Sequence, residues 1–185
     1  MWPWATRSSK PLVAGLLLLG LAAGAQGAPL LSVEEALKLA YPGCQMERRT
    51  VFLTDAQLAR ARVTAGVAVE SALVYPYRAS CDGKPGGTAY FDSHRVRTEN
   101  ETLMVALDAE GRVLRLEVVA FAEPPDYLPR PPWYQQFQGQ RLGPELDLGR
   151  GIRAVTGATL TARATTEAVR RTLALDQVLR EVAAP

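Results

Sequence analysis

The sequence predicts a small single-domain α+β protein in which an antiparallel sheet packs with helices and a loop leads into a C-terminal helix. Three observations support this fold class: short capped helices near the N-terminus, a strand pair in the middle of the chain, and a long C-terminal segment with helical spacing. The 185 residues, 48 % of them hydrophobic and 22 % charged, are enough for one domain with its own core.

Residues 1–27 have the layout of a secretory signal peptide. Two cations precede an apolar run over residues 12–25, and small residues follow. We place cleavage after Gly27, which leaves residues 28–185 as the mature domain. The alternative is an uncleaved membrane anchor, for which the run is short of the roughly 20 residues that span a bilayer. Without this leader the chain carries 19 basic and 19 acidic residues, so its charge does not indicate nucleic acid as a partner.

Cys44 and Cys81 are the only two cysteines. In an exported protein an even number of cysteines favours a disulfide, which here would close a loop of 37 residues. The alternative is two separate thiols. With a single histidine and no C-x-x-C pair, the sequence predicts no zinc or haem site.

Two short helices are expected in the first third of the chain. The first follows Ser32, has an acid-rich first turn and stops before Pro42. The second begins at Thr54 or Asp55 and places apolar residues on one face up to Ala65.

Strands are expected next. Short β-prone runs surround the turn-rich "CDGKPGG", and the clearest strand pair is Leu103–Leu107 with Val113–Phe121. The "DAEG" between this pair supplies a tight connection in which Gly111 is free to take positive φ. The following "EPPDYLPRPPW" can join neither a central strand nor a helix interior, so we expect an ordered loop.

The last helix is expected from about Ala162 to Val182. Directly before it stands the hexamer Thr156-Gly157-Ala158-Thr159-Leu160-Thr161. Gly157 allows the backbone to turn or to approach a ligand closely, and the start of a helix attracts anions, above all phosphate. The alternative is that Thr159 or Thr161 is only an N-cap. Thr165 and Thr166 are expected on the helix surface.

The segment "AVTGATLTARATTEAVRRTLAL" resembles the C-terminal signature of the FMN-binding domain family. Members of this family include the extracytoplasmic flavin subunits of sodium-translocating NADH:quinone reductase and of Rnf-type electron-transport complexes. The strand pair, the "AEPPDY" segment through Glu123 and Pro125, and the "WYQQFQGQRL" segment through Trp133 and Phe137 are similar to upstream units of the family. The resemblance covers about residues 87–176.

The resemblance implies FMN as the cofactor, joined through its phosphate to the Thr159 hydroxyl by a flavin transferase. Six residues before this threonine, where the family carries an acid, the chain has Arg153, whose guanidinium is expected to attract the flavin phosphate. Around the phosphate or near the flavin the resemblance places these further residues: Thr156, Gly157, Ala158, Leu160, Thr161, Glu123 and Pro125.

Four other side chains have two possible roles each. His94 is expected to be a polar residue near a strand end, or else to contact the flavin or relay a proton. Tyr127, Trp133 and Tyr134 either stack on the isoalloxazine ring or pack as a satellite of the core.

The resemblance implies an exported electron carrier that exchanges electrons with redox partner proteins, membrane-bound ones included, in the periplasm or at the outer face of the cytoplasmic membrane. No nucleophile–base pair is visible, so no catalytic residue is assigned. Two alternatives remain. One is a flavin-dependent reductase of a small extracytoplasmic acceptor, with its pocket near Glu123, and the other is a flavin-free binding domain of the same fold.

Overall fold

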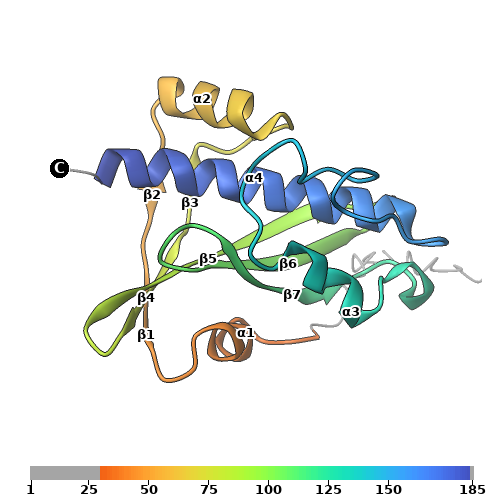
Figure 1. Ribbon diagram of the computed structural model, residues 1–185, viewed down its shortest axis with the longest axis horizontal. Helices are drawn as coiled ribbons and strands as arrows, with labels where there is room; N and C mark the ends of the chain where they lie inside the picture. Colours follow the sequence, from red (N-terminus) through yellow and green to blue (C-terminus); the bar gives the residue numbers. More distant parts are fainter. Residues whose placement is uncertain (1–29, 184–185) are drawn as a thin grey trace, which may run out of the picture.

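The computed structural model describes residues 30–183 and confirms the predicted α+β class (Figure 1). Its main sheet has five antiparallel strands in the order β1-β4-β5-β6-β7. The proposed signal peptide lies outside the described residues. The strands of the main sheet are β1 (Gln45–Arg48), β4 (Tyr77–Cys81), β5 (Lys84–Arg95), β6 (Asn100–Leu107) and β7 (Val113–Phe121).

Helices cover both faces of this sheet (Figure 1). The C-terminal helix α4 (Thr159–Ala183) lies across one face, and α1 (Val33–Ala40) packs on the other. Helix α2 (Asp55–Ala65) packs on the outer side of α4, away from the sheet. A small second sheet pairs β2 (Val51–Phe52) with β3 (Leu73–Val74).

Strand β6 lies in the middle of two hydrophobic cores. Leu103, Val105 and Leu107 pack under α4, whereas Met104 and Ala106 pack against α1, and all five are fully buried. Successive side chains of a strand point to opposite faces, so a strand buried on both faces must be apolar at nearly every position. Burial of each larger side chain stabilises the fold by roughly 1.5–3 kcal/mol.

The predicted hairpin between β6 and β7 is confirmed. Its turn is closed by the Asp108 carboxylate, which accepts the N–H groups of Glu110 and Arg112 at 3.0 and 2.8 Å. Gly111 takes the positive φ of +76° that the turn requires.

Both predicted N-terminal helices are confirmed, and each begins with a capping box. Ser32 caps α1 in exchange with Glu35, and Thr54, rather than Asp55, caps α2 in exchange with Gln57. A capping residue of this kind stabilises a helix by about 1 kcal/mol.

The Cys44–Cys81 disulfide is confirmed. It joins the residue before β1 to the last residue of β4, beside the Gln45–Ser80 pair. The first residues of β5 pack closely against this bridge, because a Cβ at Gly86 would lie 2.2 Å from the sulfur of Cys81. Glycine is therefore required at this position.

Two predictions about the C-terminal helix are wrong. The helix begins at Thr159 instead of Ala162, so Thr159 and Thr161 lie within its first turn and do not precede it. Thr165 and Thr166 are not on the surface, because their exposed fractions are 0 % and 2 %. Both residues lie in the part of α4 that is covered by the sheet and by neighbouring segments, so neither hydroxyl reaches solvent. Thr166 donates to the Ala162 carbonyl, and Thr165 donates to a carboxylate from the sheet.

The proline-rich segment is ordered, as predicted, and consists of short helices. These are the 3₁₀ helix η1 (Pro125–Tyr127), α3 (Pro131–Tyr134) and the 3₁₀ helix η2 (Gln135–Phe137). Proline is tolerated at the first helical position because its missing N–H would have no partner there. The fully buried Phe137 anchors the segment in the core under α4. Over the described residues, no helix combines the length and the apolar character that a membrane span needs.

Candidate functional site

A pocket of about 250 Å³ lies where the start of α4 meets η1 and the turn between β5 and β6. It gathers residues from three segments that are distant in the sequence. Of the nine cofactor-binding residues that the sequence predicts, directly or by resemblance, five line this pocket. The lining residues are Arg97, Tyr127, Gly157, Ala158, Thr159, Leu160 and Thr161.

The backbone before α4 turns sharply at Gly157, which has a φ of +84°. A side chain added there would meet no atom within 4 Å, so the glycine serves the backbone conformation and leaves space beside it. The buried Ala158 then accepts the N–H of Ala162 and so occupies the N-cap position. Neither Thr159 nor Thr161 caps the helix.

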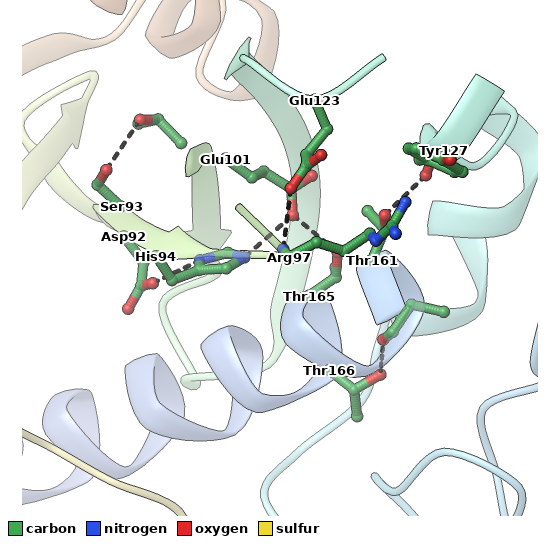
Figure 2. A network of polar contacts seen from close by, with 12 residues as sticks. Asp92, Ser93, His94, Arg97, Glu101, Glu123, Tyr127, Thr161, Thr165 and Thr166 are labelled. Atoms are coloured by element: carbon green, nitrogen blue, oxygen red, sulfur yellow. Dashed lines mark hydrogen bonds and ion pairs between the residues drawn. The ribbon is translucent and has the colours of Figure 1, made fainter. Parts of the chain in front are cut away.

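The two threonine hydroxyls of the first turn have different tasks. The exposed Thr159 donates to the Val155 carbonyl at 3.1 Å, whereas the buried Thr161 donates to the Tyr127 carbonyl at 2.7 Å and ties α4 to η1 (Figure 2). Within the described residues, the N–H groups of Thr159, Leu160 and Thr161 have no backbone acceptor. Free N–H groups and the helix dipole make this end of α4 electropositive.

Arg97 also lines the pocket. Its guanidinium lies over the Tyr127 ring, 4.7 Å from the ring centroid. The turn that carries it is held by Glu123, whose Oε1 accepts the N–H group of Arg97 at 2.9 Å (Figure 2). The same oxygen accepts the N–H groups of Thr98 and Glu99 at 2.7 and 2.9 Å. These bonds, the one from Glu99 most of all, lower the pKa of Glu123, so its carboxylate is ionised at neutral pH.

The remaining residues suggested by the sequence do not line this pocket. The Arg153 side chain is directed to Gln136. The backbone N–H and the Nε–H of Arg153 donate to Gln136 Oε1 at 2.9 and 3.2 Å. Pro125 opens η1 and reaches the pocket only through Tyr127, and Thr156 is an exposed loop residue.

Trp133 and Tyr134 pack against the core under α4, edge to face with each other. The Trp133 indole also donates to the Arg153 carbonyl at 2.6 Å. These contacts match the satellite-core interpretation, and of the three aromatic candidates only Tyr127 borders the pocket.

A buried charge cluster joins β5, β6 and α4 (Figure 2). His94 stands opposite Glu101 in the strand register, with its Nε2 3.0 Å from Glu101 Oε2 and its Nδ1 2.9 Å from Asp92 Oδ1. Arg171 donates two bonds to Asp92 at 2.7 and 2.8 Å. Thr165 completes the cluster by donating to Glu101 Oε2 at 3.1 Å.

The geometry requires a protonated imidazole, because both ring nitrogens of His94 face carboxylate oxygens. Burial alone would lower the pKa of His94, but the hydrogen bonds to Asp92 and Glu101 outweigh it and raise this pKa to about 9. Burial alone would raise the pKa of Asp92, but bonds from Arg171 and His94 lower it overall. His94 is near a strand end, as expected, and its partners make it a structural cation.

The cluster predicts a loss of stability in mild alkali. The pKa of His94 is about 9 in the folded protein and near 6.5 in the unfolded chain. Its contribution is therefore complete below pH 6.5 and declines as the pH rises through 9, by on the order of 3 kcal/mol. Urea unfolding at a series of pH values between 6 and 10 measures this decline. In His94→Gln the same curve is expected to be flatter, and equal slopes in the two proteins would contradict the assignment.

The sequence did not indicate Glu101. It occupies an inward-facing position of β6 that it shares with Leu103, Val105 and Leu107. An acidic residue that continues the every-second-residue pattern of buried apolar side chains in a strand is the signal that could have identified this buried carboxylate. Arg95 and Arg97 alternate with Val96, a pattern that fits a solvated strand face or charge supplied to a cofactor or partner. No local signal selects Arg97 over Arg95, because the place of Arg97 beside Tyr127 depends on the tertiary fold.

The fold and the pocket define a domain that presents an electropositive helix end and a threonine hydroxyl to a ligand. Residues 99–174 match the family model described as the FMN-binding domain, which confirms the resemblance. The matched residues include the hairpin, the proline-rich segment and the start of α4. The match supports FMN as the cofactor of the domain.

The chain is also similar to a curated protein that is named as a subunit of an ion-translocating oxidoreductase complex, found in two strains of Pseudomonas aeruginosa, UCBPP-PA14 and PAO1. In both cases 34 % of 91 residues are identical, over 43 % of this chain and 42 % of the relative. The chain thus matches less than half the length of these relatives. No solved structure matches the chain significantly.

The pocket residues fit the phosphate of FMN. Three residues whose N–H groups have no backbone acceptor line it together with the guanidinium of Arg97, and these are donors that phosphate groups accept from in proteins. The pocket volume of about 250 Å³ lies below the 300–1,000 Å³ or so of sites that enclose a whole ligand of this size. The pocket is therefore large enough for a phosphate group and too small for the whole cofactor.

Proposed function

We propose that this chain is an exported electron-transfer protein that carries one FMN, esterified through its phosphate to Thr159. The observation that supports this most directly is the Thr159 hydroxyl at the edge of the pocket, in the first turn of a 25-residue helix. When bound, FMN supplies the redox chemistry, because its ring accepts and releases electrons. The chain supplies a rigid anchor for it.

The ester would form by attack of the Thr159 oxygen on the flavin phosphate. In that step the hydroxyl loses its proton, a P–O bond forms, and a leaving group departs from the phosphate of an activated flavin nucleotide held by the flavin transferase. The hydroxyl is exposed and makes one bond, to the Val155 carbonyl. An exposed acceptor is what a separate modifying enzyme needs.

Two features favour a carrier over a reductase with its own substrate. The pocket is too small to enclose the flavin ring, so the ring stays accessible to a partner protein. The Glu123 carboxylate, where the reductase alternative places its pocket, is already engaged by three backbone N–H groups and is not a free acid. A carrier predicts bleaching of the flavin by dithionite without turnover of added small acceptors.

Export and membrane-associated partners complete the proposal. The leader at residues 1–27 has the pattern of a signal peptide, and the Cys44–Cys81 bridge is the kind of bond that persists in oxidising compartments. The similarity to one component of an ion-translocating oxidoreductase complex supports redox partners in such a membrane complex.

Substitution of Thr159 tests the ester. Co-expressed with a flavin transferase, the unmodified chain is expected to keep flavin fluorescence after denaturation and gel electrophoresis, and Thr159→Ala is expected to lose it completely. Thr50→Ala is the matched control, because Thr50 is an exposed threonine outside this loop that does not line the pocket. A fluorescent band that persists in Thr159→Ala would exclude this anchor.

A further inference from the structure

Arg97 is an exposed arginine that lies over an aromatic ring, as Arg48 lies over Tyr75, and it lines the pocket at the start of α4. Arg170, Arg171 and Arg180 each donate several hydrogen bonds to carbonyl or carboxylate groups. Arg97 lines the pocket, yet its guanidinium donates no hydrogen bond and forms no ion pair within residues 30–183. Its five N–H donors remain available to a ligand.

The guanidinium is nevertheless held in place from two sides. The guanidinium lies over the Tyr127 ring, and Tyr127 is itself tied to α4 through the bond from Thr161. The Glu123 carboxylate fixes the backbone at Arg97 and the two residues after it (Figure 2). An arginine ordered before binding loses little conformational entropy when a ligand arrives.

The Arg97 side chain and the electropositive start of α4 line the same pocket. Two positive groups that border one pocket repel each other, and an anion bound between them relieves this repulsion. A phosphate satisfies both groups: it accepts from the backbone N–H groups and from the guanidinium fork.

We infer that Arg97 binds the phosphate of the flavin and that Glu123 acts as a positioning residue, which holds Arg97 beside the first turn of α4. The inference rests on the proposed function, because it assigns the residues that receive the phosphate of that same cofactor. The phosphate charge is thereby recognised by Arg97 and not by Arg153, whose side chain is directed to Gln136. Glu123 holds the backbone at Arg97 and does not contact the cofactor.

Binding of two flavins that differ only in the phosphate tests the assignment. The full chain, produced without the flavin transferase, is titrated with FMN and with riboflavin, and quenching of flavin fluorescence gives both dissociation constants. Arg97→Ala is expected to weaken FMN binding by about tenfold to a hundredfold and to leave riboflavin binding unchanged. Arg97→Lys keeps the charge but not the planar fork, so an intermediate loss is expected.

Two further variants separate positioning from general stability. Arg95→Ala is the matched control, because Arg95 is an exposed arginine at the end of β5 and does not line the pocket. Glu123→Gln keeps the shape but removes the charge that binds three N–H groups, and a loss of about threefold to tenfold for FMN alone is expected. A merely structural role would weaken both flavins equally.

The outcomes distinguish the two levels of the proposal. Tighter binding of FMN than of riboflavin, lost in Arg97→Ala and kept in Arg95→Ala, supports the assignment. Equal FMN binding by Arg97→Ala and the unmodified chain overturns the role of Arg97 and leaves the proposed function standing. If the unmodified chain binds neither flavin and acquires none from the transferase, the proposed function fails as well.

Discussion

Replacement of Glu101 by alanine is expected to lower the free energy of unfolding by about 3–5 kcal/mol, a large share of the stability of a domain of this size. Glu101 is fully buried and accepts from His94 and Thr165 through one oxygen. Its removal leaves the imidazolium of His94 with one carboxylate instead of two and opens a cavity under α4. Breaking a buried ion pair costs more than the pair contributes, because a charge is left without its partner.

Urea unfolding of three variants isolates this effect. Glu101→Gln keeps the volume and one acceptor oxygen, so a smaller loss of about 1–2 kcal/mol is expected. Glu110→Ala, at an exposed position in the turn after β6, is expected to change the free energy of unfolding by no more than about 0.5 kcal/mol. If Glu101→Ala were no more destabilising than Glu110→Ala, the cluster would have no part in holding the sheet to α4.

Loss of the Cys44–Cys81 disulfide in a double serine variant is expected to lower the free energy of unfolding by about 4 kcal/mol. The bridge closes a loop of 37 residues and therefore restricts the unfolded chain. It also secures β1, an edge strand that pairs only with β4 in the main sheet. The expected result is a lower urea midpoint in the double variant.

The unmodified protein in a reducing agent is the control for this variant. Reduction is expected to lower its urea midpoint to nearly that of the double variant and to leave the variant's own midpoint unchanged. Flavin binding by the double variant is expected to persist below the midpoint, because the turn between β4 and β5 lies at the opposite end of the molecule from the start of α4 (Figure 1). An unchanged midpoint on reduction would refute the contribution of the bridge.

Features that depend on neighbouring residues were predictable. The capping boxes at Ser32 and Thr54 are local exchanges over three residues, and the β6–β7 hairpin follows from apolar strands around a glycine turn. The disulfide was predictable for another reason: two cysteines in a chain with the pattern of a secretory leader leave a single intramolecular pairing.

The two predictions that the structure contradicts concern α4, where tertiary packing determines burial and the start of the helix. Thr165 and Thr166 were assigned to the surface because threonine is polar, yet α4 is buried there and each hydroxyl has found an acceptor. The start of α4 was placed three residues late, because Thr159 and Thr161 are poor helix formers by propensity. The packing of α4 on the sheet outweighs that preference, as tertiary contacts commonly do.

The candidate site shows the same division. By itself, the sequence determined the threonine-glycine loop, the helix after it and the resemblance to the FMN-binding domain family, because these reside in one continuous segment around Thr159. Only the tertiary structure decided that Arg97 faces this loop while Arg153 turns to Gln136, and that Glu123 holds a backbone turn. Side chains that are distant in the sequence meet through the strand register and the packing of α4, and no local pattern encodes such a meeting.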